Sequence, residues 1–430
     1  MISEIQEKTK ETEFGPIPED WDLLPIYDLA IWINGLAFKN INFSSNGKPV
    51  IKINELKYGV TEQTRFTNDV FSNDYFLSKG DLLFSWSGSP DTSIDAFWYN
   101  LPDGWLNQHI FKVKPKDKVT VDFLYYLFKV NKQRFIEIAR DKQTTGLGHV
   151  TIADLKRFNV VLPEIYEQKK IAEILSSLDD KIELNRQENS NLEKLANVLF
   201  KHWFVDFEFP DKDGKPYKSS GGKMVDSELG EIPEGWRVRK ISDVVSSKGG
   251  STPDTKEESF WRDGKINWAT PRDLANLNSL VLLDTDKRIT DKGLKKISSG
   301  LLPVKTILLS SRAPIGYVAV AEIPVAVNQG FIAITCEPDL HGFILFWIKN
   351  NIELIESRAN GSTFLEINKA SFRDIDIVIP ATDALRKFSE ITESIIEAIS
   401  SNEKESKKLT GIRDSLLSRL MSGKIRVNKL

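Results

Sequence analysis

The stretch Gly15-Pro-Ile-Pro-Glu-Asp-Trp21 occurs a second time in the chain, as Gly230-Glu-Ile-Pro-Glu-Gly-Trp236, at an offset of 236 − 21 = 215. A second pair lies further along, where Phe158-Asn-Val-Val-Leu-Pro163 returns as Ile375-Asp-Ile-Val-Ile-Pro380, at an offset of 380 − 163 = 217. Each member of this second pair alternates apolar residues and ends at a proline, which predicts a short strand that leads into a helix. Two ordered pairs at nearly one period indicate that the chain is a tandem duplication.

The offset between the copies changes inside each half. Asn107-Gln108 matches Asn328-Gln329 at 328 − 107 = 221, and the stretch from Gly80 to Ser85 matches the stretch from Lys305 to Ser310 at 305 − 80 = 225. Insertions and deletions are tolerated in surface loops rather than in packed elements. Each half therefore contains a globular domain with loops of variable length, and its mixture of short apolar runs and helical stretches predicts an α+β fold.

The segment after each of these prolines has the periodicity of a coiled-coil helix. Apolar residues recur at about every 3.5 residues, with one asparagine at the same position in each seam. The first seam is Ile171, Ile174, Leu178, Ile182, Asn185, Leu192, Leu195 and Leu199, and the second, 217 positions later throughout, is Phe388, Ile391, Ile395, Ile399, Asn402, Leu409, Ile412 and Leu416. Two seams of equal length predict two long helices that pack against each other antiparallel. The alternative is that each helix only covers its own domain.

These patterns divide the chain into six parts. They are a polar N-terminal extension (1–14), a first domain (15–163), a helix (164–207), a linker (208–229), a second domain (230–380) and a C-terminal helix (381–430). The linker is assigned because 208–229 is rich in Gly, Lys, Ser and Asp.

The composition is that of a globular protein, with 40% hydrophobic and 28% charged residues. No apolar run approaches the roughly 20 residues that cross a bilayer, and the polar start is unlike a signal peptide, so we expect a cytoplasmic location. Cys336 is the only cysteine and there are four histidines, so neither a disulfide nor a zinc cluster is expected. The formal charge of −3 means that any binding of nucleic acid must use local basic patches or a basic partner.

The sequence contains no catalytic constellation. It lacks the phosphate-binding G-x-x-x-x-G-K-[ST] and the G-x-S-x-G nucleophile motif. Asp211 and Asp213 are reminiscent of a metal-dependent nuclease but lie in the expected linker, and His202 is a lone histidine at a helix end. We expect no catalytic residue and no metal site.

Four motifs of the chain carry a resemblance. Leu199-Phe-Lys-His-Trp-Phe-Val-Asp-Phe-Glu208 and the stretch from Gln168 to Glu183 resemble the central conserved region and the helix start of one known family. That family is the specificity (S) subunits of type I restriction-modification systems, also called the HsdS family. The second Gly-x-Ile-Pro-Glu-Gly-Trp motif resembles its domain opening, and the stretch from Leu416 to Val427 resembles its C-terminal signature. The start of the second helix, at Thr382, lacks the Gln-Lys-Lys-Ile of the first.

The resemblance implies a non-catalytic subunit that binds double-stranded DNA. Each of its two target-recognition domains would read one half of a split, asymmetric site, while the coiled coil docks two methyltransferase (M) subunits. Two restriction/translocase (R) subunits would join for cleavage, and S-adenosylmethionine, ATP and Mg would bind to the partners. A helix from Ile165 to Phe200 would span roughly 54 Å, more than one DNA turn of about 34–36 Å.

Base edges are read by polar side chains in loops, and phosphates by Lys and Arg. The predicted DNA-reading positions are those where the repeat keeps a polar anchor beside a change of length. They are Ser85, Trp86, Ser87, Asn107, Gln108, His109, Thr144 and Thr145 in the first half, and Ser310, Ser311, Arg312, Asn328, Gln329, Arg358, Ser362 and Thr363 in the second, with Lys39, Lys48, Lys248 and Arg272 as candidate phosphate contacts.

Three alternatives remain open at this stage. The Asn-Gln pairs are shared by both halves, so they are either structural anchors or contacts common to both half-sites, while Arg312 against Ser87 differs and is a better candidate for specificity. Trp86 is expected to be packed rather than stacked on a base. The domains could also be protein-binding modules of an interaction scaffold, and a type I system could lack a cleaving subunit.

Overall fold

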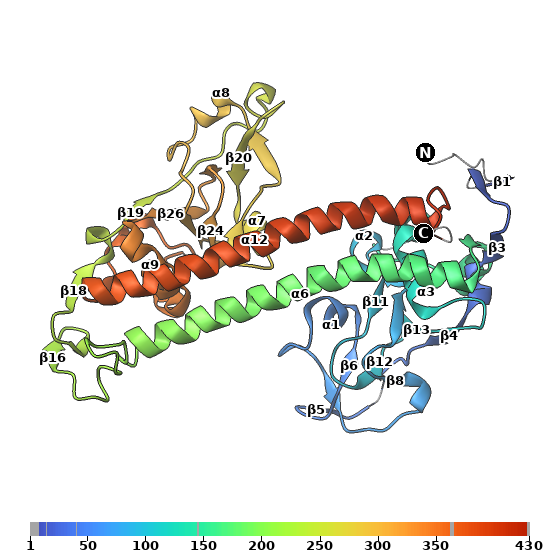
Figure 1. The fold of residues 1–430 in the computed structure, drawn as a ribbon, viewed down its shortest axis with the longest axis horizontal. Helices are drawn as coiled ribbons and strands as arrows, with labels where there is room; N and C mark the ends of the chain where they lie inside the picture. The colour runs from blue at the N-terminus through green and yellow to red at the C-terminus, as the bar shows by residue number, and fades with distance from the viewer. Residues whose placement is uncertain (1–7, 14, 40, 144–145, 362–364, 428–430) are drawn as a thin grey trace. The chain divides into compact units, whose positions relative to one another are not determined.

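The computed structural model describes residues 8–13, 15–39, 41–143, 146–361 and 365–427. The chain divides into two compact units (Figure 1): unit 1 contains Met1–Asp180 and Leu409–Leu430, and unit 2 contains Lys181–Lys408. Each unit combines small sheets with short helices and with segments of two long helices. The fold is α+β with two domains of one topology, as predicted.

Unit 1 is built on two main sheets. The first is antiparallel in the order β11-β9-β13-β4, and the second has the order β5-β7-β6-β12-β8 with β12 parallel to β6. The strands are β4 (Ala30–Asn34), β5 (Phe43–Ser44), β6 (Lys48–Ile51), β7 (Phe66–Thr67), β8 (Phe76–Leu77), β9 (Leu82–Ser85), β11 (Asp95–Trp98), β12 (Gly104–Leu106) and β13 (Ile110–Pro115). The short helices are α1 (Ile53–Tyr58), α2 (Pro90–Ser93), α3 (Val121–Val130), α4 (Lys132–Asp141) and α5 (Ile152–Arg157).

Unit 2 repeats this topology with different sequences. Its sheets have the orders β19-β26-β23-β24-β21 and β22-β20-β25, and β20 is parallel to β25 as β6 is to β12. The strands are β19 (Ser246–Lys248), β20 (Ile266–Ala269), β21 (Val281–Leu282), β22 (Lys287–Ile289), β23 (Thr306–Ser311), β24 (Ile315–Ala321), β25 (Val325–Val327) and β26 (Phe331–Thr335). The helices are α7 (Pro271–Ala275), α8 (Asp291–Leu294), α9 (Pro338–Asn350), α10 (Ile352–Ser357) and α11 (Lys369–Arg373).

The central strand of each unit is buried on both faces. In β9, Leu82 and Phe84 belong to one apolar core and Leu83 to another. In β23, Ile307 and Leu309 likewise face one core and Leu308 a second. Successive side chains of a strand point to opposite faces, so a strand between two cores has a continuous apolar run.

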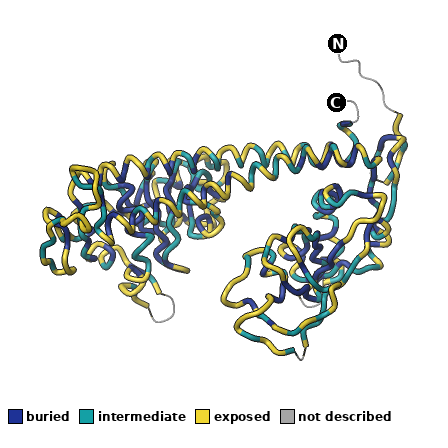
Figure 2. Tube along the Cα trace, turned by 60° about the horizontal axis from the view of Figure 1, so that its bottom comes forward, coloured by how far each residue is buried: buried dark blue, intermediate teal, exposed yellow. Residues whose placement is uncertain are grey.

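The long helices are α6 (Ile165–Phe204) and α12 (Thr382–Met421), each of 40 residues. They lie side by side and antiparallel within each unit: Arg413 contacts Asp179 in unit 1, whereas Glu405 contacts Lys181 and Asn402 contacts Asn189 in unit 2. The predicted antiparallel pair is therefore confirmed. Buried and exposed residues alternate along both helices (Figure 2).

The seam asparagines lie where the two helices face each other. The Asn185 side chain is buried, and its Nδ2 donates to Glu405 Oε2 at 2.9 Å and to Ser406 Oγ at 3.2 Å. Asn402 Nδ2 donates to Asn189 Oδ1 at 3.0 Å. A polar pair in an apolar seam favours one register, because a shift would leave its groups buried without partners.

Three of the predicted seam residues are not in the seam. Leu195, Ile391 and Ile412 are 58%, 39% and 49% exposed, while Ala196 and Phe200 are buried instead. The prediction was wrong at these positions because a strict heptad spacing drifts around a helix of 3.6 residues per turn. The buried face of α6 turns toward the unit 2 core, where Phe200 packs at 5.7 Å from Phe343.

The predicted extension and linker both contain ordered structure. β1 (Thr9–Thr12) pairs with β2 (Gly15–Pro18), and β16 (Met224–Ser227) pairs with β17 (Gly230–Pro233) in the same way. In 208–229, Phe209 stacks on Tyr217 at 4.6 Å and is 8% exposed. The segment is thus a folded part of unit 2 rather than a loose linker.

The strands at the two ends of each domain also pair. β3 (Asp22–Pro25) pairs with β15 (Asn159–Leu162), and β18 (Arg237–Lys240) with β27 (Asp376–Ile379). These pairs join the beginning of each domain to the strand before its long helix. No helix of the described residues is long and apolar enough to span a membrane.

Candidate nucleic-acid interface

In unit 1, three segments that contain predicted DNA-reading residues meet at one junction. The backbone N–H of Trp86, just after β9, donates to His109 O at 3.3 Å, and Val150 N donates to Trp86 O at 2.8 Å. β10 (Ser87–Gly88) also pairs with β14 (Gly148–His149). The junction therefore joins the end of β9, the Asn-Gln loop and the segment before α5.

Unit 2 has the same junction at equivalent positions. Ser311 N donates to Gly330 O at 2.8 Å, and Ile367 N donates to Ser311 O at 3.0 Å. The offsets from unit 1 are 311 − 86 = 225, 330 − 109 = 221 and 367 − 150 = 217, which are three of the four offsets found in the sequence repeat. The backbone of the junction is thus conserved between the units while its side chains differ.

In each unit a glycine lies directly against the backbone of the Asn-Gln loop. A Cβ on Gly35 would lie 2.1 Å from Asn107 O, and one on Gly250 would lie 1.7 Å from Val327 O and 2.7 Å from Asn328 O, so only glycine allows this approach. Asn107 N donates to Ile51 O at 3.1 Å, and Asn328 N to Ala269 O at 3.0 Å. In each unit the backbone N–H of the asparagine therefore connects the loop to a strand of the second sheet, β6 or β20.

Five predicted DNA-reading residues are buried in this structure. They are Ser85, Ser87, Asn107, Ser310 and Ser311, all at most 8% exposed. Ser310 Oγ donates to Pro314 O and accepts from Tyr317 N, both at 2.8 Å, which shows that it shapes the turn after β23. The five side chains are turned into their own units in this structure.

At the junction of unit 1, Gln108 is half-buried and His109 is exposed. Gln108 Nε2 lies 3.2 Å from His109 Nε2, and partial burial lowers the pKa of His109, which favours the neutral ring. Trp86 stacks on Phe111 at 5.5 Å and donates from Nε1 to Asn34 Oδ1 at 3.0 Å, so its ring is packed, as expected.

Unit 2 presents a different set at the same place. Gln329 is exposed, and its Oε1 accepts from Thr252 Oγ1 at 2.6 Å; half-buried Asn328 accepts at Oδ1 from Gly330 N at 2.8 Å. Arg312 is partly exposed and forms an ion pair with Glu366 at 3.5 Å. Arg312 stands where unit 1 has buried Ser87 (312 − 87 = 225), so the two units offer different chemistry.

The predicted cations are exposed but do not all lie at the junction. Lys248 ends β19 next to the Gly249-Gly250 pair, Arg272 lies in α7, and Arg358 follows α10. Lys39 follows the Gly35 segment, whereas Lys48 lies in β6 above the Phe76 ring. Thr144, Thr145, Ser362 and Thr363 lie outside the described residues.

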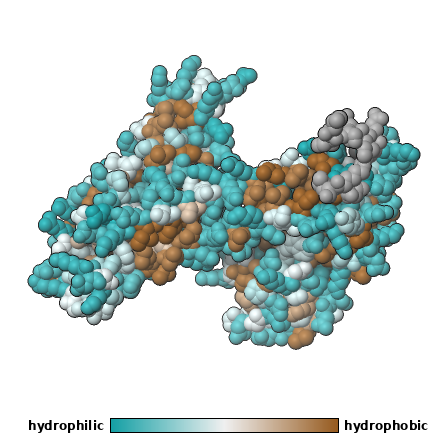
Figure 3. Space-filling model, in the orientation of Figure 1, coloured by the Kyte–Doolittle hydropathy of each residue, from teal (hydrophilic) through white to brown (hydrophobic). Residues whose placement is uncertain are grey.

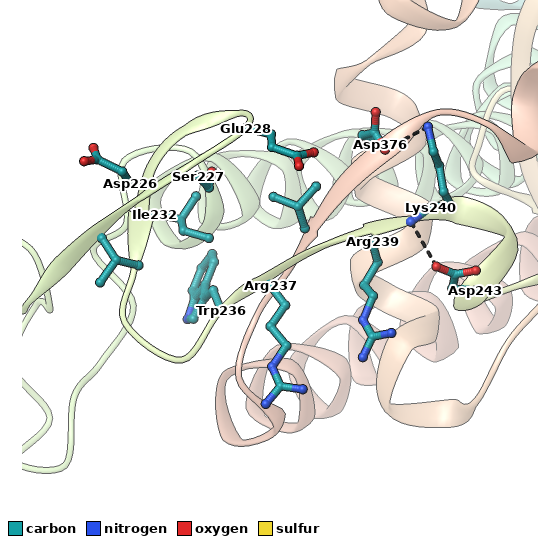
Figure 4. A pocket seen from close by; sticks show the side chains of 12 residues that line it. Asp226, Ser227, Glu228, Ile232, Trp236, Arg237, Arg239, Lys240, Asp243 and Asp376 are labelled. Atoms are coloured by element: carbon teal, nitrogen blue, oxygen red, sulfur yellow. Dashed lines mark hydrogen bonds and ion pairs between the residues drawn. The ribbon is translucent and has the colours of Figure 1, made fainter.

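The sequence reasoning missed two groups of polar residues. Thr252 binds Gln329, and its signal was the glycine pair before it, since Gly250 corresponds to Gly35. Arg237 and Arg239 line a surface cavity of about 670 Å³ beside β18. Figure 4 shows both side chains pointing to one side of the strand, away from Asp226 and Glu228.

Neither Arg237 nor Arg239 forms a side-chain hydrogen bond or ion pair with any described residue, unlike Lys240, which pairs with Asp376 at 2.9 Å. Unit 1 has Asp22 and Leu24 at the equivalent positions (237 − 22 = 215). The pair of arginines is therefore a feature of unit 2, and the cavity beside it is also lined by Asp226, Glu228, Asp243 and Asp376.

Two domains of one topology with variable exposed loops, combined with a pair of antiparallel helices, define a target-recognition subunit. The model of the family described as "Type I restriction modification DNA specificity domain" matches the chain twice, at residues 18–194 and 233–410. The chain belongs to this family. It is a specificity subunit of a type I restriction-modification system, a non-catalytic component whose role is DNA target recognition; catalysis takes place in partner subunits.

Individual relatives agree with the family. The chain is 28% identical to the type I restriction enzyme MjaIX specificity subunit of Methanocaldococcus jannaschii, covering 98% of this chain and 97% of the relative. It is 26% identical to the HindI specificity subunit of Haemophilus influenzae, covering 81% and 87%. The crystal structure of an S subunit from M. genitalium shares the fold, with a TM-score of 0.56 at 17% identity over 93% of this chain and 96% of that one.

Proposed function

We propose that the chain reads a bipartite, asymmetric DNA site, one half with each domain, and docks two methyltransferase subunits on its helix pair. The observation that carries this proposal is the shared junction at which a common glutamine has different neighbours: His109 beside Gln108 in one unit, and Thr252 and Arg312 near Gln329 in the other. A common backbone positions a reader in the same way on the duplex, and different side chains select different bases.

Docking of two identical partners is supported by equivalent exposed apolar positions on the long helices. Leu195 of α6 and Ile412 of α12 are related by 412 − 195 = 217, and both are exposed. On α6, Leu184, Leu195 and Val198 recur on one helical face and are all exposed. Figure 3 shows apolar surface along the C-terminal half of α12. Exposed apolar stripes of this kind mark interfaces with partner proteins.

We further propose that two restriction subunits join this assembly for cleavage and that the complex acts on DNA in the cytoplasm. S-adenosylmethionine, ATP and Mg would bind to the partners. This part of the proposal is what membership of the specificity-subunit family implies.

Gel-shift titration of the chain with its methyltransferase partner tests DNA reading against a scaffold role. The duplexes are a genomic fragment that the complex methylates, the same fragment with either half of the site scrambled, and unrelated DNA. We expect tight binding only to the intact site, because each lost half removes several base contacts at about 1–3 kcal/mol each. Equal affinity for all duplexes would favour the scaffold.

A further inference from the structure

A polar cluster joins the two long helices in unit 1. Arg413 Nη1 of α12 contacts Asp179 Oδ1 of α6 at 2.7 Å, and Tyr126 Oη of α3 donates to Asp179 Oδ2 at 2.8 Å. Arg413 and Asp179 are about three-quarters buried, with side chains 27% and 29% exposed. We call these three residues the middle cluster.

A second polar cluster of unit 1 lies just after the C-terminal end of α12. Arg426 Nε lies 2.8 Å from Glu167 Oε1, Arg426 Nη2 lies 2.6 Å from Asp20 Oδ2, and Trp21 Nε1 donates to Glu167 Oε2 at 3.0 Å. The Arg426 guanidinium also lies over the Trp21 ring, 5.6 Å from its centroid. Arg426 and Glu167 are 9% and 5% exposed in their side chains. We call these four residues the end cluster.

Unit 2 has apolar residues at the equivalent position of every charged group. For the middle cluster, Tyr126, Asp179 and Arg413 correspond to Phe346, Ile396 and Ala196, at offsets of 346 − 126 = 220, 396 − 179 = 217 and 413 − 196 = 217. All three are buried in the core of unit 2.

The end cluster follows the same rule. Glu167, Arg426 and Asp20 correspond to Ala384, Phe209 and Gly235, at offsets of 384 − 167 = 217, 426 − 209 = 217 and 235 − 20 = 215. Trp21 is kept as Trp236, and Phe209 packs on it at 5.0 Å where Arg426 covers Trp21. Both cations thus belong to the C-terminal arm, residues 409–427, and the acids belong to α6 or the first domain.

Because the chain is a duplication, two copies could pair like with like, α6 with α6 and α12 with α12. In an α6–α6 pair, Asp179 would face Ala196 and Glu167 would face Phe209; in an α12–α12 pair, Arg413 would face Ile396 and Arg426 would face Ala384. In these pairs Asp179 and Glu167 would lose the guanidinium opposite them, and Arg413 would lose Asp179 and keep Asp414 of its own helix, at 2.7 Å. Removing one partner of a buried ion pair is far more costly than keeping the pair intact.

We propose that the two clusters are a pairing code that makes α6 pair only with α12 and excludes like-with-like association with a second copy of the chain. Replacing a buried ion pair by apolar residues is often neutral for stability, and unit 2 shows that this fold accepts the apolar solution. The charges therefore determine which helix pairs with which. They make the α6–α6 and α12–α12 pairs unfavourable, and this matters as much as the contact that they form in the native α6–α12 pair.

Refolding of the full-length chain from denaturant over a range of protein concentrations tests the code, with the dimer fraction measured by light scattering after size exclusion. The erased variant carries the unit 2 residues in unit 1: Tyr126→Phe, Asp179→Ile, Arg413→Ala, Glu167→Ala, Arg426→Phe and Asp20→Gly. The matched control keeps the erased end cluster but reverses the middle ion pair, Asp179→Arg with Arg413→Asp.

We expect wild type and control to refold as monomers and the erased variant to form at least about tenfold more dimer at equal concentration, since 1.4 kcal/mol of discrimination gives that factor. Equal dimer fractions in the erased variant and wild type, or a dimeric control, would overturn the proposal. If the erased variant fails to fold, a measurement of Tm on simpler variants still tests the proposal. Arg426→Phe alone should lower Tm and Glu167→Ala added to it should restore Tm; no recovery would also overturn the code.

Discussion

At the scale of single residues, the two units carry different side chains at positions where their backbone conformation is the same. Lys305 shows this well: its φ is +67°, in the left-handed region, at the position where unit 1 has Gly80 with φ +95°. A side chain there costs on the order of 1 kcal/mol or more. Lys305 offsets this cost through ion pairs with Glu322 at 3.1 Å and with Glu393 of α12. Its carbonyl accepts from His341 Nε2 at 2.9 Å.

Arg312 is the residue at which a change should alter reading in one half-site only. Arg312→Ala should relax or change one half of the methylated motif, because an arginine contact to a base is worth about 1–3 kcal/mol. Stability should change little, since the ion pair with Glu366 is 36% and 43% exposed. Methylome sequencing of cells that carry the variant measures the motif, with Glu366→Ala as the control for loss of the ion pair. An unchanged motif would refute the assignment.

His341 should make unit 2 sensitive to acid. Burial lowers the pKa of His341 below its ordinary 6.5, so below about pH 6.5 the unfolded chain binds a proton that the folded chain binds less readily. Stability from this group is therefore present above that pH and is lost as the pH falls. The drop in Tm between pH 7.5 and 5.5 should be smaller in His341→Asn than in wild type, while His202→Asn, at an exposed position, should leave the drop unchanged. Identical drops in wild type and His341→Asn would contradict this.

At the scale of elements, periodicity predicted what depends on local sequence. The strands at 82–85 and 306–311 and both long helices were predictable because their apolar runs and heptads are long. β1 and β16 were not, since a four-residue strand with polar residues has no distinctive pattern. The paired bonds from Thr12 Oγ1 to Gly15 O and from Ser227 Oγ to Gly230 O show that the repeat begins before Gly15.

The helix pair should not tolerate an unpaired charge in place of an apolar residue on its inner face. Leu178 is partly buried in α6, so Leu178→Asp should separate the helices in unit 1 and abolish copurification with the methyltransferase subunit. The expected loss of stability is about 2–5 kcal/mol, as for other disrupted apolar contacts. Leu301→Asp, at a leucine that is 47% exposed, is the matched control. Wild-type yield of the complex from Leu178→Asp would count against a role of the seam in assembly.

At the scale of the whole molecule, the duplication explains both what the sequence predicts and what it conceals. The shared topology follows from the repeat, and so does the common junction built by Trp86 and Ser311. The individual base contacts do not, because unlike side chains at one backbone position carry no shared signal. Ser85 and Ser310 illustrate the problem: they match in sequence, and both are buried in this structure, so their match does not separate a structural role from a DNA contact.

The proposed docking of two methyltransferase subunits makes a prediction about stoichiometry. If the exposed residues Leu195 and Ile412 each belong to one docking face, Leu195→Asp should remove one of the two subunits and Ile412→Asp the other. Native mass spectrometry of the purified complexes should show two partners in wild type, one in each single variant and none in the double variant. Loss of both partners from a single substitution would contradict two independent docking faces.

The central claim is that one chain carries two different readers of DNA. Single-molecule methylation sequencing of a strain with and without the gene for this chain tests it most directly. We predict an adenine-methylated motif that disappears with the gene and consists of two unlike specified blocks separated by a gap of constant length. A continuous motif, two identical blocks, or a methylome unchanged by the deletion would contradict the account.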